Sequence, residues 1–222
     1  MKHGHNTVII NDHIIELNIS EFDPRWIGRG ALNSQTRTWV MNIPKNASNS
    51  IGRLIAPGNR PRASWQTEVL LKNLQQPDDQ YIVVLRNPID RFCGSLAQHY
   101  VIRLEHGSTL PEIHSEIDSL AWCEDVFDDM HIWPQFTYLH GIPLANTTWF
   151  TLENIHELPD HLGITSEIGQ WNASDDNETL GVTKKRIRTI LDTNPDVKSH
   201  VESYYEKDIE MITNILGKLP KK

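Results

Sequence analysis

An apolar run followed by a polar turn and a helical spacing is the most informative pattern in the chain. Trp39–Ile43 is an apolar, β-type run that ends at Pro44. The polar stretch Lys45–Ser50 follows, and apolar residues then recur in Ile51–Ile55 at the spacing of one helix face. A strand, a polar turn and a helix in this order direct backbone N–H groups and a helix N-terminus toward an anion. The pattern therefore predicts a loop that binds phosphate or sulfate.

A second unit of the same kind lies further along the chain. Tyr81–Leu85 is almost wholly apolar, which is typical of a buried parallel strand. Arg86 follows it, and Pro88 suits the first turn of a helix that continues to about Leu104. Two such units in series predict an α/β fold with a central parallel sheet flanked by helices. Ligands bind beyond the carboxyl ends of such strands, so Lys45 and Arg86 are expected at one edge of the sheet.

The remaining pattern predicts shorter elements around this core. Thr7–Ile10 and His13–Leu17 are expected to form a β-hairpin, and Phe22–Gln35 a connecting loop. Ser64–Leu74 has a helical spacing. The second half is more helical, and its expected elements are helices at Ser115–Phe127, His131–His140, Asn154–Leu162, Thr183–Leu191 and Pro195–Leu216, a strand at Thr147–Leu152 and a polar loop at Trp171–Gly181.

Composition narrows the class of protein. The chain of 222 residues predicts a single domain, with a hairpin and loop at 1–35 and a ligand-binding core at 36–216. A hydrophobic content of 38% with seven Trp supplies a core, and a net charge of −8 disfavours nucleic acid as a partner. Cys93 and Cys123 match neither a metal pattern nor a disulfide framework. The sequence has no signal segment and no apolar run of about 18 residues, so we expect a cytoplasmic protein without a membrane partner.

The first loop departs from the Walker A pattern of ATPases and GTPases. That pattern is G-x-x-x-x-G-K-[ST], whose glycines let the backbone wrap the phosphates. Here Lys45 precedes the polar run, and the loop has no glycine before Gly52. A standard ATPase or GTPase is therefore disfavoured, while a P-loop-type kinase of a nucleotide or small molecule stays open as an alternative.

Two motifs occur in series, I-P-K-N-A-S-N-S-I at 43–51 and V-L-R-N-P-I-D-R-F-C-G-S at 84–95. They resemble the 5′-phosphosulfate loop and the 3′-phosphate motif of sulfotransferases that use 3′-phosphoadenosine 5′-phosphosulfate (PAPS). Three weaker matches to the carbohydrate-directed branch follow in order, at 124–135 (which contains D-D-M-H-I-W-P-Q), 149–155 and 204–210. The resemblance covers about residues 36–216. It implies a P-loop-NTPase-like sulfotransferase fold, PAPS as co-substrate, and transfer of a sulfuryl group to a hydroxyl, on a carbohydrate rather than on a small phenol.

The resemblance assigns donor-binding roles to both loops. Lys45 would donate to the leaving bridging oxygen or to the sulfuryl group, where charge grows during an in-line displacement. Arg86 would hold the 3′-phosphate with a bidentate fork, and no metal is required. The backbone N–H groups and the hydroxyls that would cradle the 5′-phosphate belong to Asn46, Ala47, Ser48, Asn49 and Ser50.

One position departs from the family pattern. In the family, the serine that helps to bind the 3′-phosphate lies eight residues after the arginine. Here that position is Gly94, and the serine is Ser95. One residue is a rotation of about 100° on a helix. Either the helix begins irregularly and Ser95 binds the phosphate, or another group replaces the serine.

The acceptor hydroxyl requires a general base within hydrogen-bond reach. His131 is the first candidate, because it lies in the segment that resembles the family's His-Trp motif. Glu68 is the second, because some family members use a glutamate on the helix after the loop. His99 and His140 are further candidates, and the acceptor itself and the oligomeric state stay open.

Other polar and aromatic residues have structural alternatives to a ligand role. Arg91 is as consistent with an ion pair as with ligand binding. Glu153, Tyr204 and Asp208 are expected to anchor structure. A non-catalytic nucleotide- or carbohydrate-binding relative, which would need Arg86 but not Lys45, also stays open. The aromatic residues expected in the core are Trp122, Trp133 and Trp149, and the basic residues that either face water or contribute one nucleotide contact are Lys184, Lys185, Arg186 and Arg188.

Overall fold

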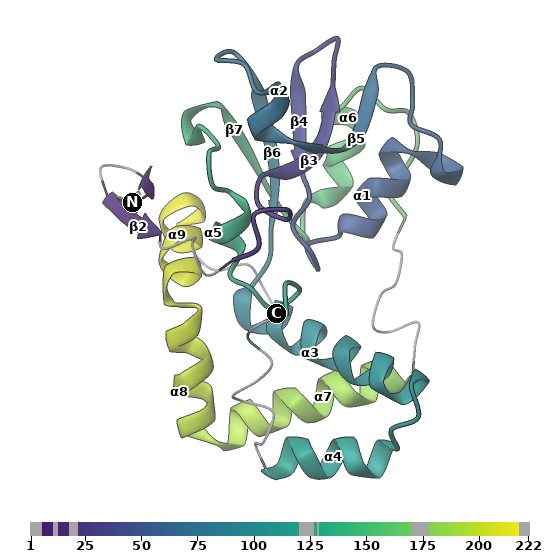
Figure 1. Ribbon diagram of the computed structural model, residues 1–222, viewed down its shortest axis with the longest axis vertical. Coiled ribbons are helices and arrows are strands. Elements are labelled where there is room, and N and C mark those ends of the chain that lie inside the picture. Colours follow the sequence, from purple (N-terminus) through teal and green to yellow (C-terminus); the bar gives the residue numbers. More distant parts are fainter. Residues whose placement is uncertain are drawn as a thin grey trace.

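The computed structural model describes the backbone of residues 6–10 and 13–17, and backbone and side chains of residues 22–119, 127, 129–169 and 178–217. The main sheet has five strands in the order β5-β3-β4-β6-β7. The strands β4 (Thr38–Met41), β6 (Gln80–Leu85) and β7 (Thr147–Thr151) run parallel. β3 (Arg29–Asn33) is antiparallel to both β4 and β5 (Trp65–Leu70). The protein is therefore α/β, with a mixed sheet flanked by helices (Figure 1).

The prediction of a parallel sheet is confirmed for β4, β6 and β7 and wrong for the β3 edge. The expected loop at Phe22–Gln35 contains β3, which returns directly into β4. Asn33 Oδ1 accepts the backbone N–H groups of Gln35 at 3.0 Å and Thr36 at 3.2 Å and so closes the turn. A connection this short produces an antiparallel pair, because parallel strands need a long crossover.

The predicted helix at Ser64–Leu74 is also wrong for most of its length. Residues Trp65–Leu70 form β5, and only Leu71–Leu74 is helical, as α2. The apolar spacing fits both periods, and pairing with β3 favours the strand. The pairing register shifts between Gly30 and Leu32, and Glu68 lies opposite this irregularity with a φ of 61°. Glu68 is thus on a strand and not on a helix after the loop.

Alternate residues of the central strands face opposite sides of the sheet. Tyr81, Val83 and Leu85 are buried against α5 (Gln135–Tyr138) and α9 (Glu206–Leu216). Ile82 and Val84 are buried on the other side, against α1 (Ser48–Ile55) and the segment that contains α6 (Leu158–His161). Both faces of β6 are therefore covered, as the apolar run predicted.

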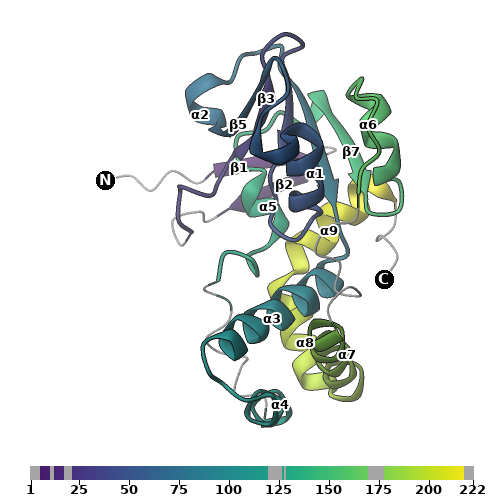
Figure 2. The same ribbon diagram turned by 90° about the vertical axis from the view of Figure 1, so that its right-hand side faces the viewer.

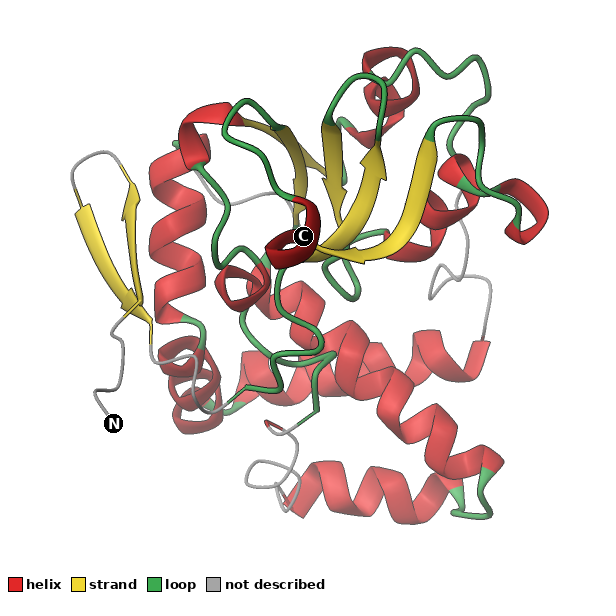
Figure 3. Ribbon diagram, turned by 45° about the horizontal axis from the view of Figure 1, so that its top comes forward, coloured by secondary structure: helices red, strands yellow, loops and turns green. Residues whose placement is uncertain are grey.

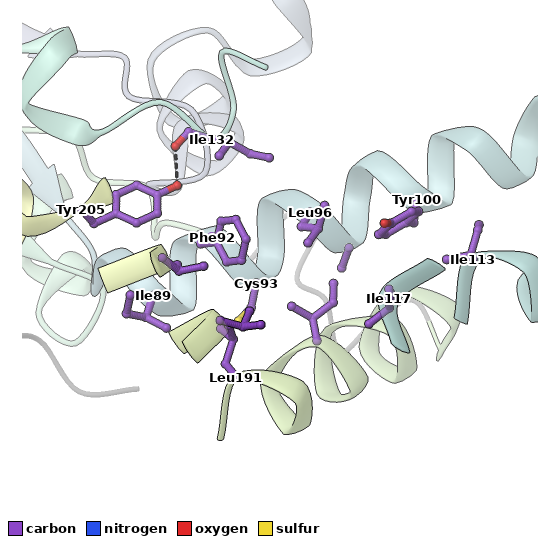
Figure 4. Packing of buried hydrophobic residues seen from close by; sticks show 14 of the residues in the cluster. Ile89, Phe92, Cys93, Leu96, Tyr100, Ile113, Ile117, Ile132, Leu191 and Tyr205 are labelled. Atoms are coloured by element: carbon purple, nitrogen blue, oxygen red, sulfur yellow. Dashed lines mark hydrogen bonds between the residues drawn. The ribbon is translucent and has the colours of Figure 1, made fainter. Parts of the chain in front are cut away.

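A helical layer lies below the sheet in Figures 1 and 2. It contains α3 (Pro88–Glu105), α4 (Leu110–Ser119), α7 (Glu178–Thr193) and α8 (Pro195–Tyr204). β6 leads directly into α3, so the carboxyl end of the sheet meets this layer. Figure 4 shows its core, where α3 packs against α4 and α7.

The predicted final helix is broken in two. α8 ends at Tyr204 and α9 begins at Glu206, and the Tyr205 side chain between them is buried. Its hydroxyl donates to the Ile132 carbonyl oxygen (Figure 4). The break therefore ties the C-terminal helices to the segment that carries His131.

The N-terminal hairpin is confirmed. β1 (Asn6–Ile10) and β2 (His13–Leu17) pair antiparallel beside α9 (Figure 3). Several boundaries in the second half differ from the prediction. α4 begins at Leu110 and α7 already at Glu178, and only Gln135–Tyr138 of the helix predicted at His131–His140 is α-helical, as α5. The parts of the predictions at 120–126, 128 and 170–177, Trp122 and Cys123 included, lie outside the described residues. No described helix has the length and apolar character needed to cross a membrane.

Candidate functional site

A pocket of about 1070 Å³ opens where β4, β6 and β7 end. Residues that directly follow these strands line it, namely Asn42, Arg86 and Leu152. Its volume lies at the upper end of the range for small-molecule sites, which suits two ligands side by side. Most of the residues predicted for the site line this pocket: Lys45, Ala47, Ser48, Asn49, Ser50, Glu68, Arg86, Ser95, His99 and His131.

The loop between β4 and α1 has an unusual backbone. Lys45 has a φ of 68° and Ala47 a φ of 59°, both in the left-handed region. For a residue with a side chain this conformation costs about 1–2 kcal/mol, so other contacts must hold the loop. The Asn46 side chain donates to the Val84 carbonyl oxygen at 2.7 Å, and Arg91 Nε donates to the Pro44 carbonyl oxygen at 2.9 Å. The loop is therefore braced from β6 and α3.

Asn46 is turned into the protein rather than toward the pocket. Its side chain is buried, and its backbone N–H donates to the Ile43 carbonyl oxygen at 3.1 Å. The first turn of α1 begins after Ala47, and no side chain caps it. The anion-binding part of the loop is thus reduced to Ala47–Ser50, at the N-terminus of α1, where backbone N–H groups and the helix dipole favour negative charge.

Arg86 reaches across to the first loop. Its Nη1 donates to the Lys45 carbonyl oxygen at 3.0 Å, and its Nε donates to Asp90 Oδ2 at 2.7 Å, with Nη2 on the same carboxylate oxygen. A guanidinium has five N–H donors, so Nη1 and Nη2 each keep a second one. A Cβ added at Gly94 would lie 3.8 Å from both nitrogens. The Nη1–Nη2 end of the guanidinium, here called the end-on fork of Arg86, therefore lies beside Gly94 on α3. Gly94 is the position at which the sulfotransferase motif has serine.

Asp90 forms ion pairs with three basic side chains. Besides Arg86, Lys184 Nζ lies 3.0 Å and Arg188 Nη2 3.3 Å from its Oδ1. Burial by itself raises the pKa of Asp90, but Arg86 and Lys184 reverse this effect and hold the pKa below its usual value. Three positive charges around one carboxylate leave an excess of positive charge beside the pocket. Of the other basic residues on α7, Arg186 pairs with Asp118, away from the pocket lining.

Lys45 is half-buried in the pocket wall. Its Nζ donates to Gln98 Oε1 on α3. Burial lowers the pKa of the Lys45 ammonium to about 8, and the positive charges of Arg86 and Arg91 act in the same direction. An ammonium has three donors, so Lys45 has hydrogen-bonding capacity left for a ligand oxygen.

The segment that carries His131 is fastened to α3. Ser95 Oγ is buried and lies 2.9 Å from the Arg91 carbonyl oxygen and 2.7 Å from that of His131. The Ser95 hydroxyl is thus engaged with the main chain. Asp129 Oδ1 lies 2.8 Å from His131 Nδ1, and its Oδ2 lies 3.7 Å from His99 Nδ1. Two histidines therefore share one carboxylate inside the pocket.

Gln135 joins the two loops from behind. Its Oε1 accepts the Arg86 N–H at 3.0 Å and a bond from the Asn46 side chain, while its Nε2 donates to the Arg86 carbonyl oxygen at 2.8 Å. Asp208 on α9 accepts the N–H groups of Gln135 at 2.7 Å and Phe136 at 2.9 Å. Burial raises the pKa of Asp208 to about 6. Asp208 is an anchor, as its sequence context suggested.

Within the described part of the chain, Arg91 neither forms an ion pair nor lines the pocket. It is fully buried, and it donates to the carbonyl oxygens of Pro44, Trp133 and Ile132, at 2.9, 2.6 and 3.5 Å. Its Nη2 has no hydrogen-bond partner among the described residues. Arg91 thus adds a buried positive charge behind Lys45 while it holds the loop.

Glu68 lines the pocket from the opposite wall. It forms an ion pair with Arg29 at 2.5 Å, and the Arg29 guanidinium lies 4.7 Å from the centre of the Trp26 ring. His140, a further candidate base, is not among the lining residues, while Trp133 is in the core and Trp149 packs against it. Among the described residues, no group of His, Cys, Asp or Glu side chains is arranged to hold a metal ion.

Comparisons of the chain with protein-family models, with curated proteins and with solved structures found no match. The resemblance to sulfotransferases therefore rests on the sequence motifs.

Sequence reasoning missed four polar residues of this site. Asp129 and Gln135 lie within the D-D-M-H-I-W-P-Q segment and flank the candidate base, so their position was a usable signal. Asp90 lies one helical turn after Arg86, which is the spacing of an ion pair within a helix. Gln98 carried no signal of its own, because its contact with Lys45 joins residues that are distant in sequence.

Proposed function

We propose that this protein transfers a sulfuryl group from PAPS to a hydroxyl of an acceptor. The observation that carries the proposal is the pairing of the two loops. β4 and β6 are parallel neighbours, and Arg86 Nη1 lies 3.0 Å from the Lys45 carbonyl oxygen. Two anion-binding elements thus line one pocket, as a donor with a 5′-phosphosulfate and a separate 3′-phosphate requires.

The 5′-phosphosulfate lies against the N-terminus of α1, at Ala47–Ser50. The 3′-phosphate lies against the end-on fork of Arg86 and the Lys184 ammonium, which also lines the pocket. Ser95 is not needed for this contact, because its hydroxyl is engaged with main-chain carbonyl oxygens. In place of a serine hydroxyl, the phosphate finds open space beside Gly94, which has no side chain.

In the transfer step, the acceptor oxygen forms a bond to sulfur while the bond from sulfur to the bridging phosphate oxygen breaks. The electron pair of that bond leaves with 3′-phosphoadenosine 5′-phosphate. Lys45 donates to the bridging oxygen as its negative charge grows. The acceptor proton passes to the free ring nitrogen of His131, the general base.

The acceptor is a carbohydrate in this proposal. The wall opposite α3 carries Trp26, Arg29 and Glu68, an aromatic ring beside two charged groups. Such a combination stacks on the apolar face of a sugar ring and hydrogen-bonds to its hydroxyls. Glu68 is then an acceptor-binding residue.

Isothermal titration calorimetry with 3′-phosphoadenosine 5′-phosphate, AMP and ATP tests the donor assignment. We expect the bisphosphate to bind tighter than AMP, and Arg86→Ala to lose about 10- to 100-fold in affinity for it, because a hydrogen bond to a charged group contributes about 1.5–3 kcal/mol. Arg60→Ala, at an exposed site outside the pocket lining, is the matched control. A bisphosphate that binds no tighter than AMP contradicts the assignment, and ATP binding that requires Mg²⁺ favours a kinase.

A further inference from the structure

Asp129 is the residue of the pocket that the proposed transfer step does not yet explain. It has two different partners, one on each carboxylate oxygen. Oδ1 accepts the His131 backbone N–H at 2.7 Å and lies 2.8 Å from His131 Nδ1. Oδ2 lies 3.7 Å from His99 Nδ1 on α3. The carboxylate is therefore held in one orientation from both sides.

The carboxyl group of Asp129 stays ionised in this position. Burial by itself raises the pKa of its carboxyl, but the bonds with His131 and His99 more than reverse this effect and hold the pKa well below the usual value. A carboxylate accepts hydrogen bonds and donates none. Neutral His131 must therefore carry its ring proton on Nδ1, which leaves the lone pair on Nε2.

We propose that Asp129 is a positioning residue that fixes His131 in the Nδ1–H tautomer, so that Nε2 accepts the proton of the acceptor hydroxyl. This inference rests on the proposed sulfuryl transfer. Nδ1 is engaged with Asp129, and Nε2 has no hydrogen-bond partner in the described ranges. Once Nε2 takes up the proton, the positive imidazolium lies beside the negative carboxylate, which stabilises it. A base oriented by a third group in this way is a recurring arrangement in enzymes that activate a hydroxyl.

Two anchors support the placement. Ser95 Oγ lies 2.7 Å from the His131 carbonyl oxygen, and the Tyr205 hydroxyl donates to the carbonyl of the next residue, Ile132. The main chain around the imidazole is thus fixed to α3 and to the break between α8 and α9. His131, His99, Asp129 and Lys45 are the titratable groups that face one another here, and all line the same pocket.

Asp129→Ala is the sharpest test. Asparagine would not serve, because the oxygen beside Nδ1 also accepts the His131 backbone N–H, so an amide would keep its oxygen at that position. Alanine removes the acceptor, so the Nδ1–H tautomer is no longer favoured and the proton can lie on Nε2, at the reacting position. We expect kcat with a saturating acceptor to fall by about 10²- to 10⁴-fold, the range spanned by general-base catalysis and by a base held in the wrong tautomer. Affinity for 3′-phosphoadenosine 5′-phosphate should stay unchanged. Asp118→Ala, at an exposed carboxylate paired with Arg186, is the matched control.

The ring nitrogens provide a readout that a merely structural role would not move. The ¹⁵N chemical shifts of His131, assigned by their loss in His131→Gln, should show a protonated Nδ1 in the wild-type protein and a shift of the proton toward Nε2 in Asp129→Ala. The double variant should be no slower than His131→Gln alone, because the two residues act as one unit.

The outcomes separate this inference from the proposed function. A wild-type His131 that is protonated on Nε2 overturns the inference whether or not nucleotide binds, and so does an unchanged kcat in Asp129→Ala. If His131 has its proton on Nδ1 but the bisphosphate does not bind, the proposed function is overturned and the positioning of His131 by Asp129 is supported. The wild-type spectrum decides the tautomer even if the variants fail to fold.

Discussion

The side chain of Gln135 and the main chain of Arg86 exchange two hydrogen bonds. Gln135 Oε1 accepts the Arg86 N–H at 3.0 Å, and Gln135 Nε2 donates to the Arg86 carbonyl oxygen at 2.8 Å. The same Oε1 also accepts a bond from the Asn46 side chain. One buried amide thus sets the distance between the two loops that line the pocket.

Gln135→Leu should therefore weaken both folding and binding. The substitution keeps an apolar stem but leaves polar groups of Arg86 and Asn46 without a partner. A buried polar group that loses its hydrogen bond costs about 1–3 kcal/mol, so we expect at least that loss in the free energy of unfolding. Urea denaturation measures it, with the exposed Gln76→Leu as control. Equal stabilities of the two variants would show that the hydrogen bonds of Gln135 do not stabilise the two loops.

Asp90→Asn should destabilise the free protein more than the liganded one. Without the carboxylate, the cations of Arg86, Lys184 and Arg188 repel one another. Removal of one partner from a buried charge pair costs about 3–5 kcal/mol, and the partial exposure here lowers that figure. A bound 3′-phosphate supplies replacement negative charge. Thermal unfolding should therefore show a larger ligand-induced rise in Tm for Asp90→Asn than for the wild type, and an equal rise would refute the role of Asp90.

Lys45→Ala should affect the transfer rate far more than product binding. Its bond to the bridging oxygen strengthens only as the leaving group gains charge. Loss of one such donor costs about 10²- to 10³-fold in kcat. Steady-state kinetics and calorimetry with 3′-phosphoadenosine 5′-phosphate give the two quantities. Equal losses in both would show that Lys45 only binds.

The activity should fall on the alkaline side because of Lys45. Burial lowers the pKa of its ammonium to about 8, so the free enzyme loses this positive charge as the pH rises past that value. The pH profile of kcat/KM reports groups of the free enzyme. Lys45→Arg keeps its charge throughout, since the guanidinium pKa exceeds about 12. We expect a lower but flat alkaline profile for this variant, and the same decline in both proteins would assign it to another group.

The two strand–loop–helix units were predictable because their signal is local. Each apolar run is buried on both faces and is followed directly by its polar loop, as at Tyr81–Leu85 and Arg86. The antiparallel edge was not predictable in the same way. It depends on the turn that Asn33 closes and on the register between β3 and β5.

The candidate site was predictable only where a motif covers it. Lys45, Arg86 and His131 line one pocket, as expected from their motifs. The orientation of Asn46 and the engagement of the Ser95 hydroxyl were not visible, because both depend on partners distant in sequence, Val84 and His131. The sequence pattern identifies the loop, but hydrogen bonds to residues distant in sequence determine which of its atoms line the pocket.

Asp208 has a consequence for the order in which the protein matures. Gln135 aligns both loops, and Asp208 on α9 holds the main chain of Gln135 and Phe136. During synthesis, Lys45 and Arg86 leave the ribosome well before Asp208 does. The nascent chain thus carries both loops before it carries the carboxylate that helps to align them, so the pocket is complete only after the last helix has docked.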